Sequence, residues 1–425
     1  MKRTPQSSLK TRREFLKYGA KGASLIALSQ YAPGFAIEAA RSAELAADKD
    51  ATIFVFVKLG GGNDGLNTLV PVNDGTYYDY RPNIAIPKDQ ALMIEDDYGL
   101  NPAMSGFQEL YKEGNLAVFQ DVGYPNSTRS HFSGQDFYER GGGYEYSGTG
   151  WLGRYLDADC PLDPKASQTD PNAVHISRHL PITLRTESPN AIYSMLSSNI
   201  RTMLARSVAT DETATLLKKT VEAAVGEENP SVSYLNMSYM NALVTDEKVQ
   251  EVVSNYKADV EYPEENLASD LRAVAALISS GMGSRIYSLD TGGFDTHSNE
   301  NTRHEELLGG LSGAVTAFVK DLQAKKLADQ VIVMPFSEFG RRPYENGTAG
   351  TDHGTQSCFF VAGTQVKGGL YASHVTIPGD RRSDLMYTKT STDFRQLYAT
   401  VLDQWLGGNS EAILGKAYEH VDFIG

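Results

Sequence analysis

Cysteine, basic charge and long apolar runs are all scarce in this sequence, and each shortage removes a class of protein. There are 2 cysteines in 425 residues and neither lies in a C-x-x-C spacing, so we expect no disulfide framework. Lys and Arg number 39 against 53 Asp and Glu, and the net charge of -14 argues against nucleic acid as a partner. No apolar stretch approaches the roughly 20 residues that cross a bilayer, so we predict no stable membrane span.

The two cysteines leave one alternative open. Cys160 and Cys358 could pair in an oxidising compartment, but Cys358 opens the apolar run CFFVAG, which favours a place in the core.

Residues 1–36 differ in character from the rest of the chain. Arg12 and Arg13 are followed by Phe15, then by a modest apolar stretch and the small-x-small pattern Gly34-Phe35-Ala36. This order resembles a twin-arginine export signal, which receptor proteins read as an address. The prediction is a removable signal peptide over 1–36, the twin-arginine export machinery as a partner, and a periplasmic or secreted bacterial protein. The alternative is two ordinary basic residues.

Apolar periodicity over 50–425 alternates between strand and helix types. Predicted strands lie at 51–59, 115–123, 285–290, 330–336 and 358–363. The stretch from about 200 to 282 is helical in pattern and broken by Pro230 and Pro263, which predicts a helical insertion. Strands alternating with helices predict an α/β fold, with a mostly parallel sheet covered by helices on both faces.

Two helix starts can be predicted from their capping residues. Asn101, with Pro102 after it, predicts a helix over 101–114. Ser127 or Thr128 can cap a helix through RSHFSGQDFYER, which brings Ser130 and His131 into its first turn.

Acidic residues and histidines bracketed by glycine follow several of these strands. Loops at the carboxyl ends of strands in an open α/β sheet converge on one crevice. Carboxylate oxygens and imidazole nitrogens suit a divalent ion such as Zn²⁺ or Mn²⁺, although each residue alone has a local structural explanation. We predict one or two divalent ions (Zn, Mn, Mg or Ca), held by Asp64, Asp295, His297, Glu338, Asp352 and His353.

The first of these loops also fits a different pattern. Gly60, Gly62 and Gly65 have the G-x-G-x-x-G spacing of dinucleotide-binding loops. That site requires a crossover helix after the third glycine, whereas Pro71 and an Asn-Asp-Gly turn follow within ten positions. The pattern therefore favours the metal interpretation.

The order of these motifs resembles the alkaline phosphatase and sulfatase superfamily. The elements are Asp64 after the first strand, Ser130 at a helix start, Asp295 with His297, Glu338 in SEFGR, and DHG at 352–354. The motifs GGGNDGLN, RSHF, GWLGRYL, GGFDTH and SEFGR are similar to those of a twin-arginine-exported bacterial family of unknown function in that superfamily. The resemblance runs from about residue 52 to 420.

That resemblance implies an alkaline-phosphatase-like fold over 50–425 and a role for each site residue. One ion would be held by Asp64 and Glu338 beside the nucleophile Ser130. A second would be held by Asp295, His297 and His353, with Asp352 as a further ligand or as the partner that orients His353.

The sequence departs from the superfamily in two places. Glu338-Phe339 stands where alkaline phosphatases carry Asp-His, so one imidazole is missing unless His131 replaces it from its helix. The C/S-x-P-x-R run from which sulfatases make formylglycine is absent from the sequence, so sulfuryl transfer by that route is not expected.

Arginines near these loops indicate the kind of substrate. Arg129, Arg154 and Arg341 are candidates for bidentate contact with a small anionic ester. The resulting hypothesis is an exported metal-dependent hydrolase of phosphate or sulfate esters, with Ser130 and His131 as catalytic candidates. Its alternative is a metal-stabilised periplasmic binding or assembly protein without turnover.

Overall fold

The computed structural model describes residues 52–142, 148–159, 171–177, 179–187, 192–195, 249–371, 375–379 and 391–425. All of them belong to a single compact unit, Thr52–Gly425. The predicted signal peptide, Cys160 and most of the predicted insertion lie outside the described residues. Among the described residues, no helix combines the length and apolarity needed to cross a membrane.

The central strand β1 (Ile53–Gly60) is buried on both sides of the sheet. Side chains alternate between the two faces of a strand, so Val55 and Val57 enter one apolar cluster while Phe54 and Phe56 enter the other. A run of branched and aromatic residues without polar alternation is what a strand covered on both faces requires.

β1 lies near the middle of a nine-stranded sheet. The strand order is β13 (Gly369–Tyr371), β5 (Leu116–Gly123), β12 (Ser357–Ala362), β9 (Val331–Phe336), β1, β8 (Ile286–Gly292), β6 (Ala173–Ile176) and β7 (Ile192–Met195), with β14 (Thr392–Asp393) also paired to β5. Every described pairing in this sheet is parallel except the two that β12 makes, with β5 and β9. The predicted mostly parallel sheet is confirmed.

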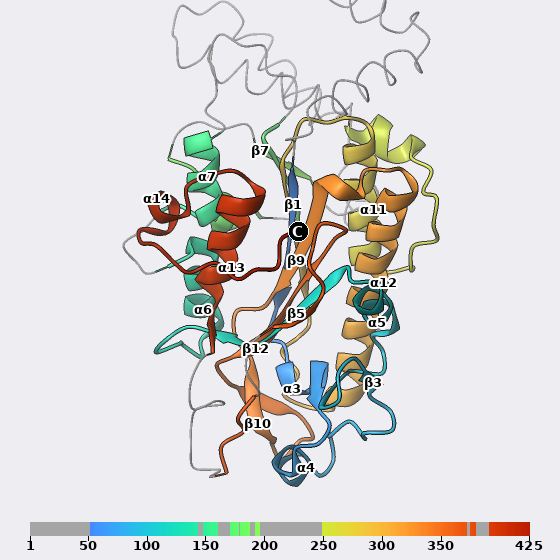
Figure 1. The fold of residues 1–425 in the computed structure, drawn as a ribbon, viewed down its shortest axis with the longest axis vertical. Helices are drawn as coiled ribbons and strands as arrows, with labels where there is room; N and C mark the ends of the chain where they lie inside the picture. The colour runs from blue at the N-terminus through green and yellow to red at the C-terminus, as the bar shows by residue number, and fades with distance from the viewer. Residues whose placement is uncertain are drawn as a thin grey trace, which may run out of the picture. The chain divides into compact units, whose positions relative to one another are not determined.

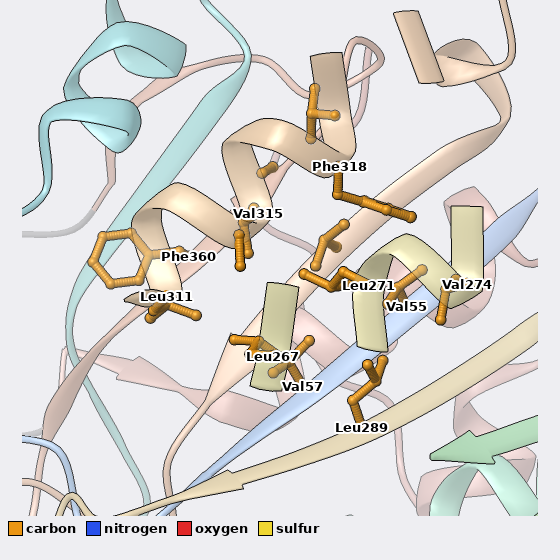
Figure 2. Close-up of a cluster of buried hydrophobic side chains, with 14 of the residues drawn as sticks. Val55, Val57, Leu267, Leu271, Val274, Leu289, Leu311, Val315, Phe318 and Phe360 are labelled. Atoms are coloured by element: carbon orange, nitrogen blue, oxygen red, sulfur yellow. The ribbon is translucent and has the colours of Figure 1, made fainter. Parts of the chain in front are cut away.

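Helices cover both faces of this sheet (Figure 1). One layer contains α5 (Ser105–Lys112), α11 (Asn266–Ser279) and α12 (Glu300–Ala324); the other contains α6 (His131–Arg140), α7 (Trp151–Asp159), α13 (Phe394–Thr400) and α14 (Ser410–Leu414). Figure 2 shows the first layer's core, where Leu271 and Val274 of α11 and Val315 of α12 pack over Val55 of β1. Helices on both faces were predicted, and this is confirmed.

The remaining elements lie outside the central sheet. They are α3 (Gly65–Thr68), α4 (Gly75–Tyr80), a small sheet of β2 (Leu69–Pro71), β4 (Tyr98–Leu100) and β3 (Leu92–Met93), the hairpin of β10 (Arg341–Glu345) and β11 (Thr351–His353), 3₁₀ turns at Ile182–Leu184 and Ala328–Gln330, and a π-helical turn at Val401–Trp405. Since α3 has only 4 residues and leads into a strand of a different sheet, no dinucleotide-type crossover helix follows the first glycine loop.

Both predicted helix starts shift. Helix α5 begins at Ser105, because Asn101 accepts the Ala103 N–H in a turn that precedes the helix. Helix α6 begins at His131 with Ser130 as its N-cap, because Thr128 Oγ1 accepts the Ser130 N–H. Ser130 is therefore the last residue before the helix and does not lie in its first turn.

Candidate metal centre

Loops from several strands meet at one edge of the sheet. The loops after β1, β8 and β9 leave from carboxyl ends, and β12 begins at the same edge because it runs in the opposite direction. The N-terminus of α6 joins them. Three histidines from three of these segments, His131, His297 and His353, lie around Asp295.

Each of the three imidazoles has an oxygen near its Nδ1 atom. His131 Nδ1 lies 2.8 Å from Glu338 Oε1, and His353 Nδ1 lies 2.8 Å from the Arg129 carbonyl oxygen. His297 Nδ1 lies 3.4 Å from Asp352 Oδ1. Because carbonyl and carboxylate oxygens only accept, Nδ1 carries the proton and Nε2 keeps its lone pair in the neutral ring. Metal-binding histidines are oriented by the same kind of partner.

The three Nε2 atoms converge on Asp295. His297 Nε2 lies 3.0 Å and His353 Nε2 lies 3.2 Å from Asp295 Oδ1, and the two Nε2 atoms are 3.0 Å apart. His131 Nε2 lies 3.6 Å from Asp295 Oδ2. The ligating atoms of His131, Asp295 and His353 all fall within 4.8 Å of one another.

This donor set fits a divalent cation. Two Nε2 lone pairs facing each other at 3.0 Å repel unless a proton or a cation lies between them. In a tetrahedral site with bonds of ~2.0–2.1 Å, neighbouring ligand atoms are about 3.3 Å apart. The 3.0 Å between the two Nε2 atoms of His297 and His353, and the 3.0 and 3.2 Å from them to Asp295 Oδ1, are close to that spacing, while His131 Nε2 lies 3.6 Å from the other oxygen, Oδ2. Imidazole nitrogens with one carboxylate oxygen suit zinc and its transition-metal neighbours better than Mg²⁺ or Ca²⁺.

Charge at the centre is set by Asp295 and Arg341. Partial burial raises the pKa of Asp295, but the hydrogen bond and charge of Arg341 outweigh it and bring that pKa to about 2. Arg341 Nη2 donates to Asp295 Oδ1 at 2.7 Å. Burial lowers the pKa of His353, which favours the neutral ring that a metal requires. The centre therefore presents an ionised carboxylate and at least one neutral imidazole near pH 7.

One side of the cluster is packed and the other is open. The buried ring of Phe339 lies 4.9 Å from the ring of His131 and 4.8 Å from that of His353, centroid to centroid. The side chains of Asp295 and His297 remain 47% and 44% exposed, so solvent or a ligand can reach the centre. His131 thus lies beside the Glu338-Phe339 pair.

Glu338 supports the cluster from below. Its side chain is fully buried, and Oε1 accepts from the Gly61 N–H at 2.9 Å and from Gln135 Nε2 at 3.4 Å in addition to His131. Oε2 accepts from Ser337 Oγ at 3.2 Å. With these donors around it, Glu338 orients the imidazole of His131. We therefore reassign Glu338 from a metal ligand to the residue that positions the ligand His131. Asp352 stands in the same relation to His297.

Asp64 is separate from the cluster and requires a correction. Its carboxylate is fully buried and bidentate with Arg81, at 2.5 Å to Nη1 and 2.9 Å to Nη2. It also accepts the Leu66 N–H as the N-cap of α3. Burial alone would raise the pKa of Asp64, but the charge and hydrogen bonds of Arg81 hold it well below its usual value. We reassign Asp64 to a structural ion pair.

Two of the three predicted anion-binding arginines are also corrected. Arg341 is fully buried and donates to the carbonyls of Gly61, Gly62, Phe294 and Thr351 as well as to Asp295, so it joins the site loops together. Arg154 donates to the carbonyls of Ile413, Thr149 and Arg140 and is not part of the cluster. Both are structural because their donors are used by backbone oxygens.

Arg129 and Ser130 remain at the rim of the site. Both residues are exposed. The residues on either side of Ser130 are held in place, because the Arg129 carbonyl accepts from His353 Nδ1 and the His131 side chain contacts Glu338. The Ser130 hydroxyl makes no capping bond to α6. It therefore stands beside the cluster at the N-terminus of a ten-residue helix.

The glycines of the first loop allow close backbone approach. Gly61 has φ +127°, and a Cβ there would lie 2.3 Å from the Asp295 nitrogen. Gly62 has φ +76°, and its Cβ would lie 2.3 Å from the Phe339 ring. The Gly61 N–H of this loop donates to Glu338 Oε1 and so supports the residue that orients His131.

Contributors that were not predicted from sequence include Arg81, Thr296 and Glu300. Arg81 lies in the polar segment DYRPN, and the two others flank His297, but no local pattern distinguishes a buried arginine or glutamate from an exposed one.

Comparisons with known proteins found one family and several similar solved structures. A family model described as "Protein of unknown function (DUF1501)" matches residues 50–415. No curated protein matches. Similar solved structures include the zinc complex of the periplasmic domain of EcEptC from Escherichia coli, with 10% identity, TM-score 0.32 and coverage of 73% of both chains.

Two other similar structures are a sulfatase and a phosphatase. The PsFucS1 sulfatase from Pseudoalteromonas sp. has 10% identity and TM-score 0.35, covering 91% of this chain and 74% of that chain. The alkaline phosphatase from the Antarctic bacterium TAB5 has 11% identity and TM-score 0.30, covering 74% of this chain and 92% of that chain. At these identities and TM-scores the likeness says nothing about what this chain binds.

Proposed function

The chain belongs to the family described as "Protein of unknown function (DUF1501)", and we propose that it is an exported metal-dependent hydrolase of phosphate or sulfate esters. The observation that carries the proposal is the convergence of three Nε2 atoms on the ionised Asp295 at an open edge of the sheet. The order of the sequence motifs supports membership of the alkaline phosphatase and sulfatase superfamily. The pair Arg12-Arg13 supports export by the twin-arginine route.

The geometry favours a single ion, in place of the two that the superfamily resemblance implies. Its ligands would be His131, His297, His353 and Asp295, whereas Asp64 and Glu338 are engaged by other donors. The bound ion would supply electrostatic stabilisation to the anionic oxygens of the ester. Zinc is the first candidate because three imidazoles dominate the donor set.

The chain's own groups have separate roles in this proposal. Ser130 would form the new bond to phosphorus or sulfur as the alcohol leaves, and one water would then release the acid. The first-turn amides of α6 would orient the anionic oxygens, and Arg129 would hold them from the rim. Glu338 and Asp352 keep the imidazoles of His131 and His297 in the orientation that presents Nε2.

One observation favours a second function. Asp64 and Glu338, which the resemblance assigns to the ion beside the nucleophile, are both held by other partners. A single structural ion without that second centre would suit a periplasmic binding or assembly protein without turnover.

Elemental analysis and an activity panel separate the two functions. Protein purified from the periplasm should contain one equivalent of metal and hydrolyse a member of a panel of phosphate and sulfate esters, and chelation should abolish both properties. Ser130→Ala should keep the metal and lower the rate by about 100-fold or more. Full activity in Ser130→Ala would exclude Ser130 as nucleophile. Stoichiometric metal without turnover would favour the binding protein, and absence of metal would overturn both functions.

A further inference from the structure

A fully buried glutamate lies directly beneath the metal centre. Glu300 is the first residue of α12 and has no exposed surface. Its Oε2 accepts from Thr296 Oγ1 at 3.1 Å and from Thr351 Oγ1 at 2.5 Å, and its Oε1 accepts from Asn67 Nδ2 at 3.4 Å. One carboxyl oxygen thus joins two threonines that are 55 positions apart in the chain.

Both threonines belong to the segments that carry the ligands. Thr296 lies between Asp295 and His297, and Thr351 lies two residues before His353 in β11. The Thr351 N–H also donates to the Thr296 carbonyl at 3.2 Å. The two threonines are buried while Asp295 and His297 are about half exposed, so the inward side chains are fixed and the outward ones form the centre.

The backbone at the start of α12 strengthens the same connection. The Glu300 N–H donates to the Ala349 carbonyl at 2.9 Å, and the Asn299 N–H donates to the Thr348 carbonyl at 3.1 Å. The turn between β10 and β11 is therefore attached to the end of the loop after β8. Glu300 is the side chain that closes this connection below the ligands.

Burying an acid in this position is costly, which makes a purely space-filling role a poor explanation. Burial, together with the nearby Asp64 charge, raises the pKa of Glu300 well above its usual value. An apolar side chain of similar size would fill the volume without that cost. An apolar side chain, however, has no oxygen that could accept hydrogen bonds from both Thr296 and Thr351.

We propose that Glu300 is a positioning residue for the metal centre: through Thr296 and Thr351 it holds the loop after β8 and strand β11 at the spacing that lets His297, His353 and Asp295 share one ion. Glu300 does not touch that ion. The inference rests on the proposed metal site, and its test distinguishes its own failure from the failure of that site.

The test measures zinc affinity and apo-protein stability separately. Zn²⁺ is titrated calorimetrically into the chelator-treated mature chain, and the melting temperature of the same apo sample is recorded. Glu300→Leu should weaken zinc binding by about 10- to 100-fold, the scale of losing a group that orients a ligand. Glu300→Gln keeps an acceptor oxygen and should bind zinc within about threefold of the wild type. If Glu300 only fills space, Glu300→Leu would leave the zinc affinity unchanged and would keep or raise the melting temperature of the apo protein, because Leu fills the same volume without burying an acid.

Threonine variants provide the controls. Thr296→Val and Thr351→Val should each weaken zinc binding, whereas Thr316→Val, at a buried threonine of α12 whose hydroxyl has no hydrogen-bond partner, should not. Wild-type affinity in Glu300→Leu overturns the inference. If that variant does not fold, wild-type affinity in both threonine variants overturns it. A wild type that binds no zinc, or any comparable divalent ion, refutes the metal site itself.

Discussion

Replacing Asp64 by Asn should destabilise the fold and leave the metal content unchanged. Asn keeps the shape and can still cap α3, but it removes the charge that faces the fully buried Arg81. Breaking a buried ion pair by removing one partner costs about 3–5 kcal/mol. Unfolding entropy of ~2.1 cal/mol/K per residue, over roughly 370 residues, converts that cost into a melting temperature lower by about 4–6 °C.

The pH dependence of this difference has a definite sign. The pKa of Asp64 is lowered in the folded state, so its contribution is fully present above the unfolded value of about 3.9 and is lost as pH falls toward the folded value. Protonation of Asp64 should therefore narrow the gap between wild type and Asp64→Asn below about pH 4.

Calorimetric melting and elemental analysis of the same samples provide the measurement, with His353→Ala as the matched variant. His353→Ala should lose its metal, because it removes a proposed ligand, whereas Asp64→Asn should keep one equivalent. If Asp64→Asn loses its metal while its apo form melts like the wild type, then Asp64 is a ligand and the assignment to an ion pair is wrong.

Three further predictions concern other parts of the chain. Burial raises the pKa of Asp121 to about 6, so the ionised side chain destabilises the fold. Asp121→Asn, a residue that suits the φ of 56° there, should raise the free energy of unfolding in urea by about 2–3 kcal/mol at pH 8 and leave it unchanged below about pH 4. Equal stability of the two proteins at pH 8 would contradict this assignment. Gly61→Ala places a Cβ 2.3 Å from the Asp295 nitrogen and should weaken zinc binding by at least about tenfold in titration; unchanged affinity would show that the loop can move aside. Replacing Arg12 and Arg13 by Lys should leave the protein in the cytoplasm when cell fractions are compared by immunoblot, and normal export of that variant would refute the signal assignment.

The central sheet could be predicted from sequence because its signals are local. The run IFVFVKL has no polar alternation, which indicates a strand covered on both faces, and Phe54 and Val55 do enter opposite clusters. Polar residues after such strands indicated the edge where Asp295, His297 and His353 come together. Strand ends are recognisable in a sequence, and the sheet brings them to one edge.

The partners of the polar residues could not be predicted in the same way. Asp64 and Arg81 are 17 positions apart, and Glu338 reaches His131 over 207, so no spacing rule connects them. Whether an acid after a strand binds a metal or an arginine depends on which side chain arrives from elsewhere in the fold. Arg341 could not be assigned from sequence for the same reason. A basic residue after a glycine is compatible with an exposed contact to an anion, and it is equally compatible with a buried side chain that donates to four backbone carbonyls, as the structure shows.

The reversed direction of β12 has a consequence for how this protein can vary. The chain leaves β9 at Phe336 and re-enters the sheet at Ser357 on the same edge, so the whole intervening segment, including the β10–β11 hairpin, is added without crossing either helical layer. Changes of length at the hairpin's Asn346–Gly350 turn would therefore leave the core packing intact but would act on the cluster directly, because the Thr348 and Ala349 carbonyls accept from the backbone at the start of α12.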